Sequence, residues 1–161
     1  MQPCLLLTLA LLGTASASHP APRHPQEVPA RVAEEGHRFR YTVVTQHLTY
    51  AGAQRYCREV LRGQLPSVHS ASRNQELANL ARTYTYRALW IGAVTSSRAL
   101  GAEAALRQGG SQWEDGSPWN YANWAPTQPC RIFTTCTTLS TFDGLWRSSF
   151  CFQLHPFICQ Y

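Results

Sequence analysis

From residue 39 onward, hydrophobic and polar positions divide the chain into short periodic segments. FRYTVV (39–44) alternates apolar and other residues, as is typical of a half-buried strand. TYAGAQRYCREVL (49–61) has apolar residues at helical spacing, and Thr49 is a suitable N-cap. We therefore predict a strand followed by a helix whose buried stripe has five members: Ala53, Tyr56, Cys57, Val60 and Leu61.

A second helix and a second strand follow in the pattern. Ser72 and Gln75 have the spacing of a capping box, which predicts a helix start there. LWIGAV (89–94) is a continuous apolar run that predicts a strand. The apolar face of the second helix has three members: Leu77, Leu80 and Ala81.

The end of the chain has the pattern of short paired strands. CTTLST (136–141) and LWRSSFC (145–151) are joined through Phe142-Asp143-Gly144, and an Asp-Gly pair favours a hairpin turn. PFICQY (156–161) is a last strand. Early helices and late strands together predict an α+β fold in which two helices pack on antiparallel sheet.

Residues 112–130, QWEDGSPWNYANWAPTQPC, interrupt this pattern. Three tryptophans, one tyrosine and three prolines leave room for neither a regular helix nor a buried strand. A long irregular loop needs a small core of its own, and large aromatic side chains can supply it. Alternatively, these rings stack on sugar faces, with Trp124 the best candidate. We predict that Trp113 and Trp119 are largely buried and that Trp124 is the most exposed of the three.

The N-terminal residues are of a different kind. CLLLTLALLG (4–13) is a short apolar run followed by small residues, so residues 1–17 are interpreted as a secretory signal. Neither this run nor any later one is long enough for a membrane-spanning helix. Residues 18–36 have the composition of a disordered leader or linker, which leaves 37–161 as the folded domain. We expect a secreted or granule-stored protein that does not insert into membranes.

The positive charge of the chain comes entirely from arginine. All 14 basic residues are Arg, and the formal net charge is +5. Arginine holds sulfate, phosphate and carboxylate through two parallel hydrogen bonds. Codon bias explains the missing lysines equally well, but the positive charge favours anionic partners in either case. We do not expect nucleic acid to be the physiological partner.

Four features of the sequence resemble a C-type lectin-like domain when they occur in this order. They are Cys57 in the first helix, WIGA (90–93), the C…DGLW…C pattern of 136–151, and HPFIC (155–159). The resemblance covers roughly 37–161. WNYANWAPTQP and the clustered arginines are similar to the branch of the eosinophil major basic proteins, also called bone marrow proteoglycans.

The resemblance implies two disulfides, Cys57–Cys159 and Cys136–Cys151. Five cysteines follow the signal, so one is left over in an oxidising compartment. That cysteine is then Cys130, for which a free thiol and an intermolecular bridge are both open.

Sugar-binding members of this family hold Ca²⁺ with Gln-Pro-Asp or Glu-Pro-Asn and a later Trp-Asn-Asp. Here the corresponding elements are 128–130, Gln-Pro-Cys, and 146–148, Trp-Arg-Ser. Ca²⁺ needs six to eight oxygen ligands, and no acidic residue occurs between Asp115 and Asp143. We therefore predict that the calcium site is lost and that the protein uses no cofactor.

Arginines near the lost calcium site are the candidate ligand-binding residues. The predicted ligand-binding set is Arg131, Arg147, Trp124, Gln128 and Arg107. A secondary basic patch is predicted on the first helix from Arg55, Arg58 and Arg62, although a solvated amphipathic helix face has the same pattern.

The resemblance implies a calcium-independent, heparin-binding lectin-like protein of the innate immune response, with anionic glycans as partners. That branch is far more basic and has a long acidic pro-segment, so strong cytotoxicity and autoinhibition do not carry over. The alternative is a protein–protein recognition module without a physiological glycan. Cys130 with His47, His69 or His155 could supply a nucleophile and a base, but no local motif supports an enzyme.

Overall fold

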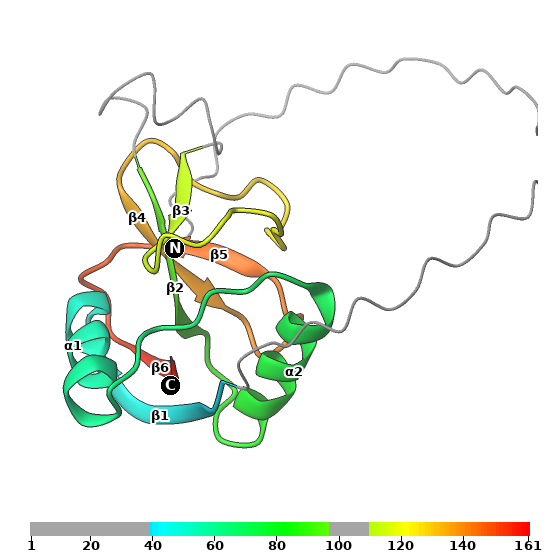
Figure 1. Ribbon diagram of the computed structural model, residues 1–161. Coiled ribbons are helices and arrows are strands. Elements are labelled where there is room, and N and C mark those ends of the chain that lie inside the picture. Colours follow the sequence, from blue (N-terminus) through cyan, green and yellow to red (C-terminus); the bar gives the residue numbers. More distant parts are fainter. Residues whose placement is uncertain (1–38, 97–109) are drawn as a thin grey trace, which may run out of the picture.

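A computed structural model of the protein describes residues 39–96 and 110–161 (Figure 1). The predicted signal, the predicted leader and Arg107 lie outside the described residues. In chain order the elements are β1 (Tyr41–Leu48), α1 (Tyr50–Val60), α2 (Ala71–Arg82), β2 (Leu89–Thr95), β3 (Ser111–Trp113), β4 (Thr135–Leu139), β5 (Trp146–Ser149) and β6 (His155–Gln160).

The strands form a mixed sheet with the order β1-β6-β2-β4-β5, and β3 pairs with β2. The β1–β6, β2–β3, β2–β4 and β4–β5 pairs are antiparallel, as predicted. The contact between β2 and β6, at Trp90 and Phe157, is parallel. The expectation of an antiparallel sheet is therefore incomplete, because the last strand inserts between the first strand and β2.

The two helices lie apart from each other, with β1 running between them at the bottom of the view in Figure 1. Thr49 caps α1 as predicted, since its Oγ1 accepts a hydrogen bond from Gly52 N at 3.1 Å. Ala53 and Cys57 are fully buried. Val60 is 57% exposed, so its place in the predicted stripe is wrong, because α1 ends at this residue.

The predicted capping box of α2 is also wrong. The helix begins at Ala71, and the N-cap is Ser70, whose Oγ accepts a hydrogen bond from Arg73 N at 3.2 Å. Ser72 therefore lies inside the first turn, with its hydroxyl 3.1 Å from that of Ser70. The apolar face is as expected at Leu77 and Ala81, which are fully buried. No helix among the described residues is long and apolar enough to cross a bilayer.

Two disulfides brace this arrangement, and both are the predicted ones. Cys57–Cys159 joins α1 to β6 with 5.3 Å between the Cα atoms. Cys136–Cys151 joins β4 to the segment after β5 with a Cα separation of 5.1 Å. The second bridge fixes the β4–β5 hairpin to the chain that follows it, next to the region where the candidate site lies.

Candidate functional site

The aromatic loop folds over a buried tryptophan, Trp146, which is the first residue of β5. Trp113 stacks on Trp119 with 4.7 Å between ring centroids, and Trp119 stacks on Trp124 at 6.3 Å. All three rings also contact Trp146 in edge-to-face (T-shaped) arrangements, and Trp146 is fully buried. Trp113 is 3% exposed, as predicted. Trp119 and Trp124 are both partly buried, so the expected order of their exposure stays a prediction.

Four hydrogen bonds attach the loop to the outer edge of β5. Trp146 N donates to Asn123 O at 2.8 Å, and Ala125 N donates to Trp146 O at 2.9 Å. Farther along the strand, Ser148 N donates to Gln128 Oε1 at 3.0 Å, and Cys130 N donates to Ser148 Oγ at 2.9 Å. The Gln128–Pro129–Cys130 segment therefore lies directly against the residues that follow Trp146. We call residues 123–130 together with β5 the loop edge.

The loop edge does not provide the donor set of a calcium site. The side-chain oxygens of Gln128 and Ser148 both accept hydrogen bonds from backbone N–H groups across the edge. The other two positions carry a sulfur atom, at Cys130, and a guanidinium, at Arg147. Calcium requires several hard oxygen ligands, so these residues do not fit the ion. No group of three or more His, Cys, Asp or Glu residues that could hold a metal occurs in the described part of the chain.

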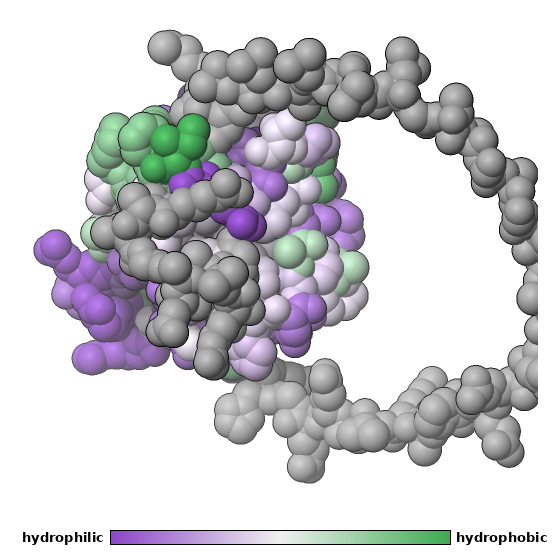
Figure 2. Space-filling view, turned by 90° about the horizontal axis from the view of Figure 1, so that it is seen from above, coloured by the Kyte–Doolittle hydropathy of each residue, from purple (hydrophilic) through white to green (hydrophobic). Residues whose placement is uncertain are grey.

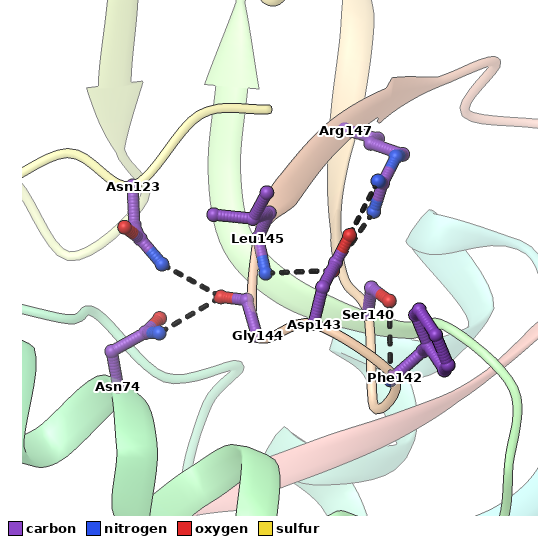
Figure 3. Close-up of polar contacts among 8 residues, drawn as sticks. All are labelled: Asn74, Asn123, Ser140, Phe142, Asp143, Gly144, Leu145 and Arg147. Carbon is purple, nitrogen blue, oxygen red and sulfur yellow. Dashed lines mark hydrogen bonds and ion pairs between the residues drawn. The ribbon is translucent and has the colours of Figure 1, made fainter. Parts of the chain in front are cut away.

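Arg147 is engaged with Asp143, an acidic residue of the hairpin turn (Figure 3). Its two terminal nitrogens donate to the two carboxylate oxygens at 3.1 and 2.6 Å, which is the bidentate geometry. These bonds hold the pKa of Asp143 well below its ordinary value and raise the pKa of Arg147. Sequence reasoning interpreted Asp143 only as a turn residue and missed this pair, although the spacing of four residues was a usable signal.

The turn itself is held by two asparagines that sequence reasoning did not select (Figure 3). Asn74 of α2 and Asn123 of the aromatic loop both donate to Gly144 O, at 2.9 and 2.7 Å. Asn74 Oδ1 also accepts a hydrogen bond from Trp146 Nε1 at 2.7 Å. These bonds join α2, the aromatic loop and the hairpin, and they fix the start of β5 against the loop.

The remaining predicted arginines lie in two places. Arg131 is partly buried and directly follows Cys130, the last residue of the loop segment of the loop edge. Arg55, Arg58 and Arg62 are exposed on or just after α1, which is well separated from β5 in Figure 1. The ion pairs of the described residues are Arg73–Glu76 and Arg147–Asp143, so these four arginines form none there.

The structure also narrows the alternatives for Cys130. This residue is 3% exposed, and none of the cysteines in the described part of the chain is a free thiol. The free-thiol alternative is therefore wrong. Two of the three histidines named with Cys130 contact other residues: His69 Nδ1 lies 2.8 Å from Asn120 Oδ1, and the ring of His155 packs against Trp90 with 4.6 Å between centroids.

The model of the Lectin C-type domain matches residues 46–161. The chain belongs to the C-type lectin domain family. Bone marrow proteoglycan of Mus musculus is 39% identical over 122 residues, which are 76% of this chain and 52% of the relative. Eosinophil granule major basic protein 2 of Cavia porcellus is 33% identical over 124 residues, which are 76% of this chain and 50% of the relative. The chain thus spans about half the length of these curated relatives.

The fold is also that of solved C-type lectin domains. The cow C-type carbohydrate-recognition domain of CD23, solved in the presence of a GlcNAc2Man3 oligosaccharide, has a TM-score of 0.62 and 27% identity. The match covers 78% of this chain and 89% of that domain. The predicted fold and the predicted resemblance to the major basic protein branch are therefore confirmed.

Proposed function

We propose that this protein is a secreted, lectin-like protein of the innate immune response that binds anionic, heparin-like glycans without calcium. The observation that carries the proposal is the position of two arginines, Arg147 in the loop edge and Arg131 directly after residue 130. The side-chain oxygens of the loop edge, on Gln128 and Ser148, already accept backbone hydrogen bonds. A sulfate group can be held there by a guanidinium through charge-assisted hydrogen bonds, with no metal ion. The relatives named for proteoglycans and eosinophil granules support a secreted or granule-stored protein.

The two arginines of the proposed site have different roles. Arg131 forms no ion pair among the described residues, so its guanidinium is available to a sulfate. Arg147 is held by Asp143, and an incoming sulfate must share or replace that carboxylate. Trp124 and Gln128 border the site, and Arg107 remains a predicted contributor. The α1 patch of Arg55, Arg58 and Arg62 is the second proposed anion surface.

Two findings keep protein–protein recognition as the second candidate function. Arg147 is already paired, which weakens the anion site. Two exposed apolar side chains, Ile132 and Phe133, directly follow Arg131 in the chain. In that case glycan binding is incidental. Catalysis is not proposed, because the relatives are C-type lectin-like proteins.

Heparin-affinity chromatography with a salt gradient tests the proposal. The unchanged protein is expected to be retained at low salt, equally with and without EDTA, and to elute as salt screens the charges. Replacing Arg131 and Arg147 by Gln should lower the eluting salt concentration clearly. The control replaces Arg55 and Arg58 by Gln, which removes the same net charge from α1 and should have a smaller effect.

A second pair of variants examines the Arg147–Asp143 ion pair. Asp143→Asn removes the carboxylate that competes with sulfate and should shift elution to higher salt. Glu76→Gln is its matched control, since it releases Arg73 from the other ion pair with the same change in net charge. Equal shifts in the two variants would indicate a diffuse positive field in place of a site. Absence of retention at low salt would leave protein recognition as the better function.

A further inference from the structure

Exposed apolar side chains gather where the segment before β4 meets the segment after β5. Ile132 is 59% exposed, Phe133 is 52% exposed and Phe152 is 73% exposed. Phe150 lies between the two phenylalanines and is partly buried. We call these four residues the apolar patch. Single exposed apolar residues are ordinary in soluble proteins, but a contiguous group marks an interaction surface.

The apolar patch is ordered. The rings of Phe150 and Phe152 are stacked, with 5.4 Å between centroids and an interplanar angle of 9°. Phe133 leans against Phe150 at 6.1 Å, so the rings of two distant segments touch. The Cys136–Cys151 disulfide links these same two segments and limits their relative movement. A partner would therefore meet a preformed surface, which lowers the entropy cost of binding.

The charges near the apolar patch indicate which charge a partner should carry. Between residues 116 and 161 the sequence has one acidic residue, Asp143, and its carboxylate is bound to Arg147. Arg131 directly precedes Ile132 and forms no ion pair within the described ranges, 39–96 and 110–161. Figure 2 shows, on the face seen from above, an apolar green area beside strongly hydrophilic purple residues.

We propose that the apolar patch, with Arg131 at its border, docks a protein segment that carries aromatic or aliphatic side chains next to Asp or Glu. Apolar side chains of the segment would cover the phenylalanine rings, and a carboxylate would pair with the guanidinium of Arg131. This docking surface shares only Arg131 with the proposed glycan-binding site. The two proposals can therefore be tested separately.

Two other occupants fit the charges less well. A second copy of the chain, related by a twofold axis, would bring identical positive surfaces together at this contact. An anionic membrane is attracted by clusters of basic residues. Within the described residues 110–161, the arginines are Arg131 and the already paired Arg147. An acidic amphipathic polypeptide matches both the phenylalanine rings and the guanidinium of Arg131.

Selection from a random peptide library displayed on phage, with the full chain immobilised, tests the proposal. Enriched peptides are expected to combine aromatic or aliphatic residues with Asp or Glu. One enriched peptide is then synthesised with a fluorescent label, and its Kd is measured by anisotropy. The double variant Phe133→Ser/Phe152→Ser should weaken binding by at least about tenfold, and Arg131→Gln should weaken it and reduce its dependence on salt.

The matched control is Tyr86→Ser/Phe142→Ser, which removes two aromatic rings that are 90% and 91% exposed and lie outside the apolar patch. It should leave the Kd unchanged. Thermal melting verifies that both double variants fold, and heparin retention of the Phe133→Ser/Phe152→Ser variant should equal that of the unchanged protein.

Four results would overturn the proposal. The first is the enrichment of peptides without acidic residues. The second is an equal loss of affinity in the two double variants. The third is a dimer, detected by sedimentation equilibrium, that the patch variant abolishes. The fourth is binding to phosphatidylserine-containing vesicles that depends on the patch while no peptide binds.

Discussion

Replacing Asn74 by Ala should destabilise the protein much more than replacing Asn123 by Ala, although both residues donate to the same carbonyl. Each substitution removes the same atoms and one hydrogen bond to Gly144 O, and each leaves that oxygen with the other asparagine as a donor. Only Asn74 also accepts the hydrogen bond from Trp146 Nε1, whose residue is fully buried.

The expected difference follows from these bonds. A hydrogen bond between neutral groups contributes about 1 kcal/mol net, so Asn123→Ala should cost about 1 kcal/mol. Asn74→Ala loses two such bonds and leaves a buried indole N–H without an acceptor, which adds roughly 1–3 kcal/mol. We expect a total of about 3–5 kcal/mol, and Asn74 is itself buried, with 4% of its surface exposed.

Urea unfolding at neutral pH, with the disulfides intact and tryptophan fluorescence as the signal, measures both free energies. The slopes of the two variants must agree with that of the unchanged protein for the comparison to be valid. Equal costs, or a larger cost for Asn123→Ala, would refute the reasoning and show that Trp146 Nε1 finds another acceptor.

Two further predictions concern the core. Trp113→Ala should lower the free energy of unfolding by roughly 3–5 kcal/mol and leave heparin retention in place; normal stability with lost binding would contradict the role in the loop core. Burial lowers the pKa of His155 below 6.5, helped by the nearby charges of His47 and Arg87. The stability due to this residue is therefore present above about pH 6.5 and is lost as the pH falls through its lowered folded-state pKa. His155→Gln should flatten that loss in pH-dependent unfolding, and an unchanged pH profile would mean that other groups control it.

Local patterns predicted most of the elements, because these depend on neighbours in sequence. The exception is β3 (Ser111–Trp113), which overlaps the stretch expected to contain no strand. Thr49 caps α1 as expected, and the Asp143-Gly144 pair turns the chain between β4 and β5. The errors occur at element ends. Ser70, not Ser72, caps α2, and Val60 faces solvent at the last residue of α1. Both errors are shifts of a few residues, because several positions satisfy the same local rule and only packing chooses among them.

The sequence by itself determined the chemistry that is present. It has a cysteine, an arginine and a serine at the positions where the resemblance implies calcium ligands, and no acidic residue between Asp115 and Asp143. These are facts of composition, and folding cannot add a missing carboxylate. The prediction that these positions do not hold Ca²⁺ therefore needs no coordinates.

Tertiary structure alone decided which of these groups have partners. The hairpin turn places Asp143 in an ion pair with Arg147. Along β5, the side-chain oxygens of Gln128 and Ser148 accept hydrogen bonds from backbone N–H groups. The ring contacts of the apolar patch likewise join residues 133 and 150, which are distant in sequence. Such contacts depend on how the strands pair and where the second disulfide closes, and a one-dimensional pattern does not contain that information.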